Sequence, residues 1–172
     1  PIVYPCPKGG KRYREKVKAL GGKYQFPFLI DPNTGVSMYE SADITEYLFR
    51  EYGRGKPPWF LRRRRFAVPT SMLASSFRPT RGRRVTPSRE PEKLLELYSY
   101  EGSPFCRIAR EALCELELPY RLRNVPRRSP SRAGFVSLSG KMQVPYLVDR
   151  NTDVAMFESA DIRDYLFDSY AL

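Results

Sequence analysis

The sequence predicts an α/β protein made of two tandem copies of one unit, a mixed four-stranded sheet flanked by helices, with the first copy lacking its first strand and helix. Three observations support this: an internal repeat, alternating strand and helix periodicity in the second copy, and an Arg- and Pro-rich segment between the copies. With 172 residues, the chain can hold two small domains, and its hydrophobic fraction of 41% suffices for packed cores. No apolar run approaches the roughly 18 residues that span a bilayer.

The repeat is visible by direct comparison. Residues 26–52 read "FPFLIDPNTGVSMYESADITEYLFREY" and residues 144–170 read "VPYLVDRNTDVAMFESADIRDYLFDSY". At a constant offset of 118, without a gap, 16 of these 27 positions are identical. Such a match does not arise from composition. The predicted boundaries are an incomplete domain at 1–52, a basic linker at 53–93 and a complete domain at 94–172.

The second copy can be assigned element by element. "KLLELYSY" at 93–100 and "YRLRNV" at 120–125 have strand composition, and between them 104–118 has the 3.6-residue apolar spacing of a helix. We expect a short helix at 131–139, and a hairpin formed by strands at 144–149 and 154–158 around the turn "RNTD". An amphipathic helix from Ser159 to about Tyr170 completes the order β-α-β-α-β-β-α.

The first copy begins late in this pattern. Tyr4 matches Leu122 and Cys6 matches Asn124, so residues 1–52 start within the second strand and lack the first strand and helix. With this connectivity the first strand lies between the second and the third. We therefore expect this half to be marginally stable, and a native form to have about 30 to 40 more N-terminal residues.

Residue types exclude several chemistries. The chain has no histidine, which excludes Ser-His and Cys-His nucleophile pairs and histidine metal sites. Its three cysteines are Cys6, Cys106 and Cys114, and they form no CxxC pair. This argues against a disulfide framework and a four-thiolate zinc site, so no metal is expected and a reducing compartment fits.

The net charge of +11 is concentrated in the linker. Basic and acidic residues number 8 and 6 in 1–52, 12 and 2 in 53–93, and 10 and 11 in 94–172, giving +2, +10 and −1. Four linker aromatics accompany the arginines: Trp59, Phe60, Phe66 and Phe77. The segment could contact an anionic membrane, but no nucleic-acid-binding fold surrounds it, so we favour a solvated tether and expect no nucleic-acid partner.

Three motifs together carry a family resemblance. "SPFC" at 103–106 opens the first helix of the second copy, "VP" at 144–145 precedes its third strand, and "ESADI" at 158–162 opens its last helix. In this order they resemble the thioredoxin-fold N-terminal domains of glutathione transferases and glutaredoxins. The "SPF" turn is most similar to plant tau-class transferases, and the tandem arrangement resembles two-domain plastid proteins. The resemblance implies tandem thioredoxin-like domains, glutathione as co-substrate, and a location in the chloroplast, or otherwise the cytosol.

Ser103 and Cys106 are the candidate catalytic residues. Serine followed by proline predicts an N-cap and a first helical residue, and the same hydroxyl can donate to a bound thiolate. The resemblance implies that Ser103 lowers the pKa of the glutathione thiol. The resemblance to glutaredoxins implies that Cys106 takes the place of the resolving cysteine without an attacking partner, and its position near the start of the helix, beside Arg107, could lower its pKa. The alternative for Cys106 is a buried apolar role, which we also expect for Cys114.

The remaining candidates would hold the tripeptide. Sequence alone favours a trans bond before Pro145, whereas the resemblance implies a cis bond and pairing of the Val144 backbone with the cysteinyl part of glutathione.

The start of the last helix is predicted to carry Ser159 as its N-cap. The resemblance gives Ser159 the γ-glutamyl carboxylate and places Glu158 near the amino group. Lys141 and Arg107 are candidates for the glycyl carboxylate, with solvated surface charges as the alternative.

These features favour a glutathione-binding thioredoxin-fold protein, with thiol redox or transferase activity toward a protein or small-molecule disulfide or electrophile. The alternative is a non-catalytic interaction module whose basic linker binds an anionic surface or partner.

Overall fold

The computed structural model describes residues 1–53 and 84–172, and its contacts group the chain into two compact units. Unit 1 comprises Pro1–Tyr13 and Thr80–Leu172, and unit 2 comprises Arg14–Pro79. The division at Tyr13 falls inside the first of the two predicted domains, so unit 1 is discontinuous in sequence. The linker aromatics Trp59, Phe60, Phe66 and Phe77 lie outside the described residues.

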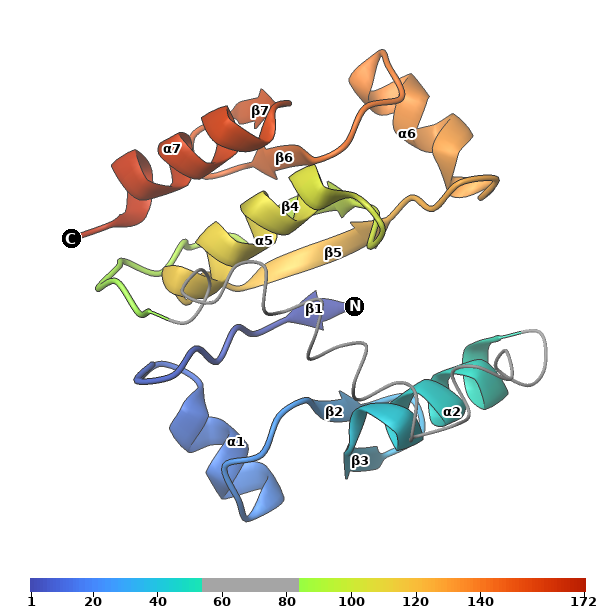
Figure 1. The fold of residues 1–172 in the computed structure, drawn as a ribbon, viewed down its shortest axis with the longest axis vertical. Coiled ribbons are helices and arrows are strands. Elements are labelled where there is room, and N and C mark those ends of the chain that lie inside the picture. The colour runs from blue at the N-terminus through green and yellow to red at the C-terminus, as the bar shows by residue number, and fades with distance from the viewer. Residues whose placement is uncertain (54–83) are drawn as a thin grey trace. The chain divides into compact units, whose positions relative to one another are not determined.

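Unit 1 is built on a mixed five-stranded sheet in the order β1-β5-β4-β6-β7 (Figure 1). Its strands are β1 (Ile2–Val3), β4 (Leu95–Ser99), β5 (Tyr120–Asn124), β6 (Tyr146–Asp149) and β7 (Val154–Met156). β4 and β5 are parallel, and the other neighbours are antiparallel. The predicted four-stranded mixed sheet of the second copy is confirmed, with its first strand between the second and third. β1 adds a fifth strand.

Helices cover both faces of this sheet. Helices α5 (Pro104–Glu115) and α7 (Ser159–Tyr170) pack together over the main core, which includes Leu97, Leu113 and Leu166. Helix α6 (Ser131–Ser139) contributes Phe135, whose ring stacks on Tyr98 at 4.9 Å between centroids. Adjacent residues of a strand point to opposite faces of the sheet. Since Leu97 faces the core under α5 and α7 while Tyr98 contacts Phe135 of α6, α6 lies on the opposite face.

Unit 2 contains helix α1 (Arg14–Gly21), strands β2 (Phe28–Asp31) and β3 (Val36–Tyr39), and helix α2 (Ser41–Tyr52). The two strands form an antiparallel hairpin, in which the rings of Phe28 and Tyr39 stack at 4.4 Å. At the repeat offset of 118, these elements correspond to α6, β6, β7 and α7 of unit 1, so the internal repeat is also a repeat of structure. The marginal stability expected for this half stays a prediction.

A buried aspartate joins the hairpin to the last helix in both copies. In unit 1, Asp149 accepts hydrogen bonds from the hydroxyls of Tyr165 and Tyr170, at 2.7 and 2.5 Å. In unit 2, Asp31 accepts the corresponding bonds from Tyr47 and Tyr52, at 2.5 and 2.6 Å. The sequence predicts the strand and the helix that carry these residues, but the bonds between them were not predicted, although the aspartate and both tyrosines recur at the offset of the repeat.

None of the helices in residues 1–53 and 84–172 combines the length and the apolar composition that a membrane crossing needs.

Candidate functional site

The strand directions of unit 1 bring three segments to one end of the sheet. β4 ends at Ser99 and leads through a turn into α5, and the antiparallel partner β6 begins beside it, with Tyr146 opposite Tyr98. β7 returns antiparallel to β6, with Met156 opposite Leu147, and leads into α7. The turn at 100–103, the Val144–Pro145 peptide and residues 157–159 therefore lie at the same end as the N-termini of α5 and α7.

Ser103 caps α5 as the sequence predicts. Its Oγ accepts a hydrogen bond from the Cys106 N–H at 3.4 Å, and Pro104 is the first helical residue. The backbone N–H of Ser103 donates to the Tyr100 carbonyl at 3.1 Å, which closes the preceding turn. In the cap the oxygen acts only as an acceptor, so the hydroxyl proton can be directed at a ligand.

Cys106 lies below this turn. Its side chain has 0% exposure, and its Sγ accepts a hydrogen bond from the Tyr100 N–H at 3.4 Å. The thiol therefore holds the turn from inside the fold. This arrangement is the buried role that the sequence analysis gave as the alternative to a reactive thiol. Phe105, beside it, is 61% exposed.

The other cysteine of α5, Cys114, is unsuited to thiolate chemistry. Cys114 is half-buried, and burial, together with the nearby Cys6 and acidic side chains, raises the pKa of its thiol to about 11. The thiol is therefore protonated at neutral pH.

The peptide bond between Val144 and Pro145 is cis, as the family resemblance implies and against the preference of sequence alone. Val144 packs against the small core of Val125, Phe135 and Tyr146. Its neighbour Gln143 donates a side-chain hydrogen bond to Glu158 Oε1. Gln143 was not among the residues predicted for the site, although Gln25 makes the same bond to Glu40 at the repeat offset.

The prediction that Ser159 is the N-cap of the last helix is wrong. Ser159 is the first helical residue, and the cap position belongs to Glu158, which makes no side-chain cap bond. Glu158 has φ 65 and ψ 121, outside the left-handed helical well, and Glu40 repeats this conformation at φ 70 and ψ 114. A non-glycine residue held in such a region is a recognised mark of functional sites.

The candidate cations take different places. Arg107 Nε pairs with Glu111 Oε1 one turn along α5, at 3.0 Å. Lys141 Nζ lies 4.3 Å from the centre of the Phe157 ring, a cation–π contact beside the start of α7. Lys141 is thus adjacent to the site, while Arg107 is directed along its own helix.

The site offers hydrogen-bond donors to an anionic ligand. The first intrahelical bond of α7 runs from Ile162 N–H to Glu158 C=O, at 2.9 Å. The preceding amides of Ser159, Ala160 and Asp161 therefore have no partner within the helix, and the helix dipole adds positive potential there. No cluster of potential metal ligands occurs among the residues that the structure describes.

The N-terminal copy repeats only part of this arrangement. It has a cis bond between Phe26 and Pro27 and the strained Glu40 before α2. Among the described residues, a serine-capped helix, a cis proline and the strained glutamate are found together in unit 1.

The strand order, the serine-capped α5 and the cis proline beside it define unit 1 as a thioredoxin-like domain. The family described as "Glutathione S-transferase, N-terminal domain" matches residues 2–58 and 97–172. The chain belongs to this family. The match covers parts of both repeats, as expected for two copies of one unit.

Two individual proteins are similar to parts of the chain. The chain is 33% identical to the "Glutathione S-transferase-like protein tpcF" of Aspergillus fumigatus over 58 residues. These residues make up 34% of this chain and 26% of the fungal protein. The solved structure of "Glutathione S-transferase unclassified 2 from Bombyx mori" aligns with 28% identity and a TM-score of 0.41, covering 46% of this chain and 37% of the other. The chain thus spans well under half of each relative.

Proposed function

We propose that unit 1 binds glutathione at the end of its sheet where α5 and α7 begin, and that Ser103 stabilises the glutathione thiolate. The observation that carries the proposal is the convergence of two helix N-termini on either side of the cis Val144–Pro145 peptide. Glutathione carries a thiol and two carboxylates, and helix N-termini favour each of the resulting anions.

Each part of the tripeptide has a suitable partner. The Ser103 hydroxyl would donate to the sulfur, and the Val144 backbone would pair with the cysteinyl residue as an added strand. The γ-glutamyl carboxylate would lie at the amides of α7 with Ser159, and its amino group near Glu158. Lys141 would pair with the glycyl carboxylate. Because Arg107 already has Glu111 as its partner, we assign it a smaller part.

The chemistry then follows from a stabilised thiolate. Its lone pair would attack an electrophilic carbon and expel the leaving group, or attack a disulfide and release one of its sulfurs as a thiolate. Cys106 is the second candidate nucleophile, but it must leave its buried position before it can react. Residence in the chloroplast, or otherwise in the cytosol, remains part of the proposal.

Titration calorimetry with glutathione tests binding. Ser103→Asp keeps a good helix cap but places a carboxylate against the thiolate, whereas Ser103→Asn is a neutral cap of similar size. We expect Ser103→Asp to weaken binding at least about tenfold at pH 8, with less effect from Ser103→Asn and unchanged thermal stability in both.

Enzyme assays then assign the chemistry. Comparison of Ser103→Ala with Cys106→Ala in disulfide reduction and in conjugation shows which group acts. Failure of the unaltered protein to bind glutathione at millimolar concentration would refute the proposal and favour the non-catalytic interaction module.

A further inference from the structure

The N-terminal segment Pro1–Tyr13 forms part of unit 1 through contacts with residues far along the chain. β1 pairs antiparallel with β5, with Ile2 opposite Arg121 and Val3 opposite Tyr120, and the Leu122 N–H donates to the Pro1 carbonyl at 3.0 Å. At the repeat offset, residues 2 and 3 correspond to 120 and 121. The second strands of the two copies thus pair with each other, covering an edge of β5 that would otherwise be open.

The rest of the segment is held by buried side chains. Pro5, Pro7 and Gly10 are buried, and Tyr13 is only 3% exposed. The Tyr13 hydroxyl donates to Glu90 Oε1 at 2.5 Å. Burial of the tyrosine, and secondly this hydrogen bond, raise the pKa of Tyr13. Its partner Glu90 lies 77 residues further along the chain, so this bond also connects the segment to residues 84–172.

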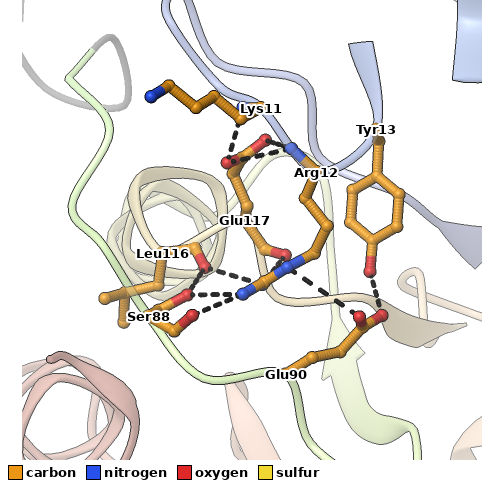
Figure 2. A network of polar contacts seen from close by, with 7 residues as sticks. All are labelled: Lys11, Arg12, Tyr13, Ser88, Glu90, Leu116 and Glu117. Carbon is orange, nitrogen blue, oxygen red and sulfur yellow. Dashed lines mark hydrogen bonds and ion pairs between the residues drawn. The ribbon is translucent and has the colours of Figure 1, made fainter. Parts of the chain in front are cut away.

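Arg12 binds the C-terminal end of α5 (Figure 2). Its Nη1 donates to the carbonyls of Glu117 and Leu116, at 2.7 and 3.4 Å, and its Nη2 donates to the Ser88 carbonyl at 2.5 Å. The last carbonyls of a helix lack partners within the helix, and a cation there also complements the helix dipole. A planar guanidinium suits this arrangement of three acceptors.

Glu117 makes the reciprocal contact. Its carboxylate accepts from the backbone N–H of Lys11 at 3.1 Å and of Arg12 at 3.2 Å, while the residue is only 6% exposed (Figure 2). A buried carboxylate needs such donors. A Cβ added at Gly10 would overlap this carboxylate, so a larger residue there would have to displace the Glu117 side chain from these donors.

We propose that residues 84–172 present a docking surface for Pro1–Tyr13, and that this docking holds the two repeats of the chain together independently of the covalent link through 54–83. The surface consists of the outer edge of β5, the C-terminal end of α5 and residues 88–90. The segment that binds this surface consists of strand β1 followed by Gly10, Arg12 and the buried Tyr13. The reciprocal pair Arg12 and Glu117 sets its specificity.

A cleavable form of the full chain tests the proposal. A protease recognition sequence is inserted within residues 54–83, and the folded protein is cut and examined by gel filtration at micromolar concentration. The two fragments are expected to elute together as one complex. If the cut fragments of the unaltered protein separate, the proposal is overturned.

Variants locate the contact. Arg12→Lys keeps the charge but loses the planar donor arrangement, and Gly10→Ala displaces the Glu117 carboxylate. Each is expected to raise the dissociation constant of the fragment pair at least about tenfold. Gly134→Ala on α6, where an added Cβ meets nothing within 4 Å, and Arg163→Ala on α7 serve as matched controls.

Circular dichroism of the uncut variants confirms that each is folded. Equal dissociation constants for test and control variants would show that the Arg12–Glu117 contact does not hold the segment, and would contradict the proposal.

Discussion

At the scale of single residues, Asp149 is the most completely satisfied buried carboxylate of unit 1. It is 0% exposed, and its oxygens accept from Tyr165, Tyr170 and Asn151. Burial alone would raise its pKa, but the hydrogen bonds outweigh burial and hold the pKa below its usual value. Because the folded pKa is depressed, ionised Asp149 stabilises the fold above the unfolded pKa, and this stabilisation is lost as pH falls through the folded pKa.

We therefore expect Asp149→Asn to lower the free energy of unfolding at neutral pH by about 1–3 kcal/mol. The difference between variant and unaltered protein should shrink on acidification, because the native carboxylate becomes protonated. Urea unfolding at neutral pH and at about pH 3 measures both effects. A difference that stays constant across this range would contradict the role given to the ionised group.

Ser99 presents the opposite case. It is 1% exposed, and among the described residues its Oγ is the one buried side-chain oxygen or nitrogen without a hydrogen-bond partner. Because an unsatisfied buried hydroxyl is costly, Ser99→Ala is expected to leave stability unchanged or to raise it by about 1 kcal/mol. Thermal unfolding checks this, and a clear loss of stability would show that the hydroxyl has a partner.

At the scale of elements, the start of α7 combines strain with the proposed ligand contacts. Glu158 has φ 65 in a region that suits glycine better. Glu158→Gly removes the strain, the bond from Gln143 and the proposed contact with the glutathione amino group.

We expect Glu158→Gly to maintain or raise the melting temperature, with strain relief of the order of 1 kcal/mol, while glutathione affinity falls. Calorimetry and thermal unfolding of the same sample measure the two effects. Glu40→Gly in unit 2 is the matched control, and it should leave affinity at unit 1 unchanged. A parallel loss of affinity in both variants would contradict the assignment of the site to unit 1.

Most elements of the second copy could be predicted from sequence because their signals are local. The apolar period of 104–118 and the Ser103–Pro104 pair located α5, and the repeat located the hairpin and α7. The bounds of α7 were predicted correctly, but its N-cap was assigned to Ser159 because a serine before an acidic turn is a common N-cap pattern, while the positive φ of Glu158 leaves no local signal. The Gln143–Glu158 bond depends on strand pairing and was also missed.

At the scale of the whole molecule, the repeat explains the duplicated cis prolines, strained glutamates and buried aspartates. The place of Pro1–Tyr13 in unit 1 could not be predicted from the repeat. It depends on contacts between residues about a hundred positions apart, such as Arg12 with Glu117, and no local periodicity reports them. The domain boundary at residue 52 reflects sequence similarity, whereas the boundary at Tyr13 reflects packing.

Glutathione binding at the end of the sheet where α5 and α7 begin is tested most directly by an amide ¹⁵N–¹H titration of the full chain with reduced glutathione. We expect saturable shifts of the amide signals of Ser103, Val144 and Ser159, with little change at Phe26 and Ser41. Absence of shifts at about 10 mM ligand, or shifts confined to other parts of the chain, would contradict it.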